Sequence, residues 1–204
     1  MKGIIGLLFC LLMADGSYAQ GTLEVTPIFG FTFNGRVESY TSSFKINDDI
    51  SYGAILSYNM NDYTAVEFSY KHSDNILTEY YYPTGSTYKM DIGIEHYQLG
   101  FQSIFKRGEV EPFAGIALGT SRYYNKDNKN DIWAFSGSIG GGVRLFFSEH
   151  IGIRIHSNVI MPMEFGGGGF FCGVGTGGGG CGAGASFYIP TVHWENSVGL
   201  IFKI

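Results

Sequence analysis

The chain has 204 residues, a formal net charge of −5 at pH 7, 16% aromatic residues and only 15% charged residues. This length allows one domain with a sizeable core, and an acidic balance without a basic stripe argues against a nucleic-acid partner. The charged fraction lies well below the roughly 25% of soluble domains. Together with 31 glycines, it favours a protein with lipid outside and a tight interior.

The N-terminal segment is typical of a secretory signal peptide. Its start is positively charged, residues 4–13 are apolar, and small residues precede Gln20. We predict cleavage between Ala19 and Gln20, which removes residues 1–19 and leaves residues 20–204 as a single domain. The apolar stretch is shorter than the ~20 residues that a membrane-spanning helix needs.

The remaining chain alternates apolar and polar residues with a period of two. Such alternation is typical of β-strands, because successive side chains point to opposite faces of a strand. It predicts eight strands, at residues 22–34, 50–58, 63–72, 91–105, 111–122, 132–147, 151–161 and 194–204. One face is apolar and uncharged over the core of each strand, as with Phe29 and Phe31 in the first and Leu200 and Phe202 in the last.

Charged residues fall on the opposite face of these strands. A Lys or Arg that faces lipid at mid-membrane costs roughly 2–4 kcal/mol, so lipid contact would select this segregation. We predict a narrow lumen filled by small residues and paired polar groups, because buried charges need partners. The predicted lumen network consists of Glu24, Glu67, Lys71, Arg144, Arg154, His156 and Lys203. A narrow ion path or small-solute site is the alternative for the same residues.

The connections between strands alternate in length. The short ones, predicted as turns, are residues 59–62, 106–109 and 148–150. The long ones, predicted as loops, are residues 36–49, 73–89, 123–131 and 162–193. This pattern predicts an all-β fold, an eight-stranded antiparallel transmembrane β-barrel with short periplasmic turns and longer extracellular loops. Closure is required because lipid offers no hydrogen-bond partner to a free strand edge. A soluble β-sandwich is the rival fold.

Three segments carry a resemblance to a known family: Pro112–Gly119, Gly140–Phe147 and Ile151–Arg154. With the strand pattern over residues 22–204, they resemble the small outer-membrane β-barrel superfamily of the OmpA/OmpX/OmpW type, the outer membrane protein β-barrel domain. The resemblance implies location in a bacterial outer membrane and recognition of the C-terminal strand by the barrel-insertion machinery. Such barrels usually end in an aromatic residue, whereas this chain ends in Ile204.

The two cysteines of the expected mature chain, Cys172 and Cys181, lie in the Gly-rich loop 162–193. Residues 166–184 contain 12 glycines in 19 positions, and ordering such a backbone is entropically costly. Because the envelope is oxidising, we predict a disulfide that closes this loop. A redox or metal pair is the alternative, with His193 as the only further ligand nearby. A phosphate cradle would need a Lys and a following helix, which this region lacks.

The remaining His and Ser residues do not form a convincing catalytic pattern. His72-Ser73 and His156-Ser157 are adjacent, so on a strand their side chains point to opposite faces and cannot hydrogen-bond. We therefore predict no catalytic residue, no cofactor and no metal site.

The expected function is that of a monomeric, non-enzymatic integral outer-membrane barrel. Its role would be envelope-structural or adhesion-like, with outer-membrane lipid around it and a surface partner at the aromatic loop segments 78–83 and 165–171. The second hypothesis is a narrow channel or an OmpW-like transporter of small solutes. The third is a lipid-modifying enzyme.

Overall fold

The structure is a computed structural model, and it describes residues 21–38, 40–126, 131–165, 179–181, 185–188 and 191–204. The described elements are all strands: β1 (Thr22–Asn34), β2 (Arg36–Glu38), β3 (Ser42–Ile46), β4 (Asp49–Asn59), β5 (Thr64–Tyr81), β6 (Ser86–Ile104), β7 (Val110–Asn125), β8 (Asp131–Phe146), β9 (Ile151–Phe165), β10 (Gly179–Cys181), β11 (Ala185–Tyr188) and β12 (His193–Lys203). Within the described ranges, no helix is long and apolar enough to cross a membrane.

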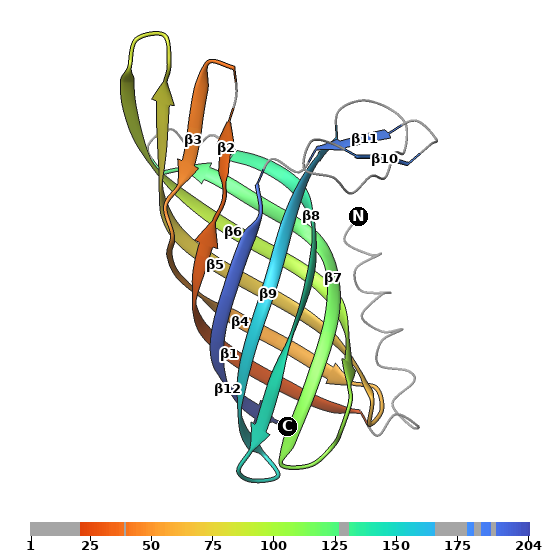
Figure 1. Ribbon diagram of the computed structural model, residues 1–204. Coiled ribbons are helices and arrows are strands. Elements are labelled where there is room, and N and C mark those ends of the chain that lie inside the picture. Colours follow the sequence, from red (N-terminus) through yellow and green to blue (C-terminus); the bar gives the residue numbers. More distant parts are fainter. Residues whose placement is uncertain (1–20, 39, 127–130, 166–178, 182–184, 189–190) are drawn as a thin grey trace, which may run out of the picture.

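Eight of these strands close into a barrel (Figure 1). The order around the barrel is β1, β4, β5, β6, β7, β8, β9 and β12, and β12 pairs with β1 to complete the circle. Every neighbouring pair is antiparallel. This confirms the predicted eight-stranded antiparallel β-barrel and excludes the β-sandwich.

The strand register sends the apolar face outward and the polar face inward. Phe29, Phe101 and Ile116 are 57%, 62% and 63% exposed, whereas Glu24 and Arg144 on the other face are almost completely buried. A soluble protein would bury the first set and solvate the second. The inverted arrangement is the one that lipid contact favours.

The two ends of the barrel differ. One end, here called the turn end, holds the connections 60–63, 105–109 and 147–150, and the start of β1 and the end of β12 lie there as well (Figure 1). At the opposite end, here called the hairpin end, strands extend beyond the barrel mouth (Figure 1).

The prediction of loops at residues 36–49 and 73–89 is wrong. β5 and β6 pair continuously up to Tyr81 and Ser86, and a tight turn with Gly85 at φ 68° joins them. β2 and β3 form a second hairpin, and β3 adds to the edge of β5. These segments are strands because backbone hydrogen bonds pair them with their neighbours. Most of their side chains face water on both sides of the sheet, so the sequence shows no alternation of apolar and polar residues there. We call β2, β3 and the outer parts of β5 and β6 (75–81 and 86–92) the projecting sheet.

Candidate functional site

The lumen near the turn end is filled by an ionic network around Arg144. This β8 side chain is fully buried, and its Nη1 donates to Glu24 Oε2 at 2.8 Å while its Nη2 donates to Glu111. Asn59 Nδ2 donates to the other oxygen of Glu24 at 2.7 Å, and Arg107 from a turn donates to Glu111 at 3.0 Å. Each buried charge is therefore paired, which offsets the cost of removing it from water.

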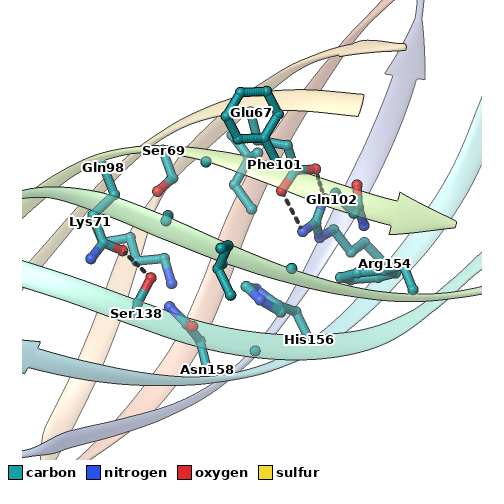
Figure 2. Close-up of a pocket in the computed structure, with 17 residues that line it drawn as sticks. Glu67, Ser69, Lys71, Gln98, Phe101, Gln102, Ser138, Arg154, His156 and Asn158 are labelled. Atoms are coloured by element: carbon teal, nitrogen blue, oxygen red, sulfur yellow. Dashed lines mark hydrogen bonds and ion pairs between the residues drawn. The ribbon is translucent and has the colours of Figure 1, made fainter. Parts of the chain in front are cut away.

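A second ion pair lies above this layer, between Arg154 of β9 and Glu67 of β5. The guanidinium donates to both carboxylate oxygens, at 2.5 and 2.9 Å, and Ser57 Oγ adds a hydrogen bond to Glu67 at 2.9 Å. The Phe113 ring lies 4.3 Å from the Arg154 guanidinium carbon. Figure 2 shows Arg154 and Glu67 pointing toward one another across the lumen. The bidentate geometry fixes both side chains across the barrel axis.

A third layer combines an ion pair with histidine contacts. Lys71 Nζ lies 3.0 Å from Glu195 Oε2, and both side chains are 2% exposed. His96 Nδ1 lies 2.7 Å from Ser121 Oγ, and the His193 ring also faces the lumen, where it is buried. The formal charges of the three layers cancel, because four cations face four carboxylates: Arg107, Arg144, Arg154 and Lys71 with Glu24, Glu67, Glu111 and Glu195.

Apolar side chains close the lumen toward the hairpin end. Ile46, Ile92 and Ile94 are buried together, and Leu77 and Tyr123 pack against them. Ile46 comes from β3, so the strand that joins the projecting sheet also covers the barrel mouth.

A small polar cavity remains between the second and third layers. Its volume is about 40 Å³, and Gln98, Gln102, Lys71 and His156 are among the side chains that line it (Figure 2). Both amide atoms of Gln102, Gln98 Nε2 and His156 Nδ1 are buried without a hydrogen-bond partner among the described atoms. A polar space of this size fits one or a few water molecules, whereas small-molecule sites need roughly 300–1,000 Å³. The described lumen therefore suits buried water and not an organic ligand.

The structure brings most of the predicted lumen residues together. Glu24, Glu67, Lys71, Arg144, Arg154 and His156 all face the interior. Lys203 lies at the turn end, with Nζ 4.9 Å from the centre of the Phe146 ring.

The predicted lumen network lacked Glu111, Glu195, His96 and Arg107, and Glu195 is the partner of Lys71. Glu111 and His96 occupy inward-facing positions in the alternation of their strands, so the sequence pattern could have placed both side chains in the lumen. Arg107 lies in a turn between β6 and β7, where no strand alternation could have placed it.

Other predicted sites are only partly covered by the structure. Ala19, Gln20 and Cys172 lie outside the described residues, and Cys181 lies in β10 with its side chain not described. Signal cleavage and the disulfide thus stay predictions. In the described part of the chain, no three His, Cys, Asp or Glu side chains are grouped to hold a metal ion.

The adjacent His and Ser side chains point apart, as strand geometry requires. His156 faces the lumen cavity, whereas Ser157 Oγ accepts a hydrogen bond from the indole of Trp194 on the outer wall. At the other pair, Ser73 hydrogen-bonds Asn75 while His72 contacts Asp74. Neither histidine can serve as a base for its neighbouring serine.

Comparison with known proteins identifies the fold. No protein-family model matches the chain, and no curated sequence matches it. Its structure is similar to the outer membrane protein OprG from Pseudomonas aeruginosa, with a TM-score of 0.62, 12% identity, and coverage of 91% of this chain and 97% of OprG.

Two further solved structures are similar over nearly their whole length. The outer membrane protein AlkL has a TM-score of 0.55 and 13% identity, with 93% of each chain covered. Neisserial surface protein A has a TM-score of 0.54 and 13% identity, with 89% of this chain and 97% of that chain covered. The chain therefore has the fold of the small outer-membrane β-barrels.

Proposed function

We propose that this protein is an integral outer-membrane barrel with a closed lumen, and that it acts through contacts made by its projecting sheet at the cell surface. The observation that carries the proposal is the combination of an interior filled by paired charges and a sheet that extends past the barrel mouth (Figure 1). The proposed role is non-enzymatic, and it is of the surface-interaction or adhesion type.

The apolar exterior supports residence in a membrane. Outward side chains such as Leu99, Ile116 and Leu118 are more than half exposed, a pattern that would be a large aggregation liability in water. Tyr52, Trp133 and Trp194 are at least half exposed near the hairpin end, where amphipathic rings suit the headgroup level of a bilayer.

The projecting sheet supports a role in recognition. Tyr80 and Tyr88 are 43% and 60% exposed, and Tyr82 in the turn that joins β5 to β6 is 46% exposed. Tyrosine supplies large contact area at low entropy cost. Cross-strand pairing holds the sheet in place before any partner binds, which lowers the ordering cost of association.

Conductance separates this proposal from a channel. The refolded protein is inserted into planar bilayers, with a general porin as the positive control. Because three ionic layers and an apolar cluster fill the described lumen, no stepwise current is expected. Reproducible unitary currents from the purified protein would contradict a closed lumen and support the transport hypothesis.

Cell attachment tests the surface role directly. Cells that display the protein are compared on immobilised extracellular-matrix proteins and epithelial monolayers, with Tyr80→Ser/Tyr82→Ser/Tyr88→Ser as the variant. Tyr63→Ser is the matched control, because Tyr63 is 65% exposed but lies at the turn end. The triple variant is expected to lose attachment while the control keeps it. Equal attachment by all three proteins, or none by the wild type, would overturn the proposed role.

An activity assay addresses the enzymatic hypothesis. Purified protein is incubated with lipid A and with phospholipids in the presence of several divalent ions, and no hydrolysis product is expected. A product that depends on the folded protein would contradict the non-enzymatic proposal.

A further inference from the structure

A second polar cluster lies outside the lumen, on the outer wall of the barrel near the hairpin end. Five outward positions are direct cross-strand neighbours on β4 to β8: Tyr52, His72, Glu95, Arg122 and Trp133. The sequence pattern predicted an apolar outward face over the strand cores, and it did not predict the charged residues on the outward face near the hairpin end. We call these residues, together with Tyr70, Tyr97, Asp74, Tyr124, Lys126 and Asp131, the outer-wall cluster.

Glu95 is the centre of the outer-wall cluster. It is only 9% exposed although it faces outward, because tyrosine rings and a guanidinium surround it. Its Oε2 accepts hydrogen bonds from Tyr97 Oη at 3.0 Å and from Arg122 Nη1 at 3.1 Å, and its Oε1 accepts one from Tyr70 Oη at 3.4 Å. His72 Nδ1 lies 3.8 Å from Oε1 and is buried without a hydrogen-bond partner among the described atoms.

The exposed side of the cluster combines a charged rim with aromatic rings. Arg122 Nε donates to Asp131 Oδ2 at 3.0 Å, and the guanidinium carbon lies 4.8 Å from the Tyr124 ring centre and 5.6 Å from that of Trp133. The rings of Tyr97 and Trp133 lie 6.1 Å apart and nearly parallel, and Trp133 is 57% exposed. The result is an aromatic surface with fixed hydrogen-bonding groups at its edge.

The cluster spans β4 to β8 and does not continue onto β1 and β12. At the corresponding end of β1 and β12, the outward side chains are Phe33 and Trp194, whose rings lie 5.5 Å apart. A ring of aromatic side chains at the headgroup level is sufficient to anchor a barrel in the membrane. Anchoring alone therefore does not require the charged side chains on β4 to β8. This asymmetry distinguishes the β4 to β8 sector from the sector formed by β1 and β12.

We propose that the outer-wall cluster binds the saccharide headgroup of a glycolipid in the adjacent membrane leaflet. Sugar hydroxyls both donate and accept hydrogen bonds, so they can use carboxylate acceptors and guanidinium or phenol donors at the same site. The exposed indole of Trp133 offers an apolar surface to the face of a sugar ring. A lipid headgroup reaches this position because the cluster faces outward at the level of the barrel mouth.

The charges of the cluster favour a neutral sugar over a phosphate. Three carboxylates, Asp74, Glu95 and Asp131, face two cations, Arg122 and Lys126, so the formal charge of these five residues is 2 − 3 = −1. Both cations are already paired, at 3.1 Å for Arg122 with Glu95 and 2.9 Å for Lys126 with Asp74. An added anion would be repelled by the carboxylates.

Single-tryptophan variants provide a direct test, because the chain has only two tryptophans. In Trp194→Phe the emission reports on Trp133 in the cluster, and in Trp133→Phe it reports on Trp194 of β12, which lies outside the cluster. Both proteins are placed in phosphatidylcholine nanodiscs and titrated with a non-phosphorylated disaccharide glycolipid. The reference titration uses a phosphatidylcholine with the same acyl chains.

A saturable change of Trp133 emission is expected with the glycolipid and not with the reference lipid. Trp194 emission should not change. Adding Arg122→Gln to the Trp133 reporter should weaken the apparent affinity by about tenfold, as expected for the loss of a charged hydrogen-bonding group. Arg36→Gln, which removes an exposed arginine of β2, should leave the affinity unchanged, and gel mobility before and after heating verifies that each variant is folded.

Three outcomes would overturn the proposal. These are equal responses of the two tryptophans, equal responses to glycolipid and reference lipid, and no response of Trp133 to the non-phosphorylated glycolipid. The test involves no surface partner, so its failure leaves the proposed role of the projecting sheet unaffected.

Discussion

Arg144 connects two carboxylates in the lumen, and its loss would leave both unpaired in a buried site. Arg144→Met should lower the free energy of unfolding by about 3–5 kcal/mol, the range for breaking one side of a buried ion pair. The measurement is urea unfolding of the refolded protein in lipid vesicles. Arg107→Met is the matched control: Arg107 also pairs with Glu111 but is 24% exposed, so its loss should cost less than about 1 kcal/mol. Equal costs for the two variants would contradict this account.

Two glycines of β8 should differ sharply in their tolerance of a methyl group. A Cβ at Gly142 would clash with the carbonyl oxygen of Ile155, so the neighbouring strand would have to move. At Gly137 the nearest atom is Met163 Cε at 3.2 Å, the flexible end of a side chain. Gly142→Ala should therefore destabilise the barrel by about 1–3 kcal/mol, and Gly137→Ala by much less. The urea midpoints of unfolding of the two variants are compared. An equal or higher midpoint for Gly142→Ala than for Gly137→Ala would contradict this prediction.

Among the strands, we propose that β12 carries the segment that barrel-insertion machinery recognises. The chain ends in Ile204, and Phe202 lies two residues earlier on the same outward face, 44% exposed. If the terminal position is what the insertion machinery reads, Ile204→Phe should speed assembly into vesicles that contain the machinery. Ile204→Val serves as the control. The readout is the fraction of folded protein against time, and identical rates for all three proteins would argue against a terminal signal.

The strands of the barrel wall could be predicted from sequence, whereas the projecting sheet could not. In β1, Phe29, Phe31 and Phe33 alternate with polar or small residues, because one face meets lipid and the other meets the lumen. In the outer part of β5, Asn75, Thr78 and Glu79 interrupt any such alternation. Beyond the barrel mouth, water reaches both faces of the sheet. The hydrophobicity pattern of the sequence therefore does not reveal that these residues form strands.

Shortening the projecting sheet should leave the barrel intact. Replacing residues 77–90 by a two-residue Asn-Gly turn removes the ends of β5 and β6 but none of the pairs between Thr64–Asn75 and Ile92–Ser103. The shortened protein should still fold in detergent and should lose attachment in the cell assay. Failure to fold would show that the barrel depends on this sheet, and retained attachment would contradict its proposed role.

For the molecule as a whole, the alternation of residues along each strand predicted most of the charged side chains that face the lumen. It did not predict which of them pair with one another. Arg144 and Glu24 are 120 residues apart, and Arg154 and Glu67 are 87 apart. Only closure of the sheet and its register bring these pairs together across the barrel axis. The outer-wall cluster was missed for a related reason, since Glu95 and Arg122 become neighbours only through the pairing of β6 with β7.

Closure of the barrel should also make the folded protein resistant to denaturation by detergent at room temperature. The hydrogen-bonded circle has no free edge in its paired segments, so unfolding must open a long ladder at once. The unheated protein should migrate in a detergent gel at a different position from the boiled protein. Identical mobility before and after boiling would be inconsistent with a closed barrel.

The contact between the end of β12 and the start of β1 has an engineering consequence. The amide of Ile204 donates to the carbonyl oxygen of Leu23 at 2.8 Å, so a short linker could join Ile204 to the start of β1 without disturbing either strand. Cutting the chain after Phe105, at the start of the turn 105–109, would then give a circular permutant whose last residue is an outward-facing phenylalanine, 65% exposed. The permutant would thus carry an outward aromatic side chain at the end of its last strand, where this sequence has Ile204.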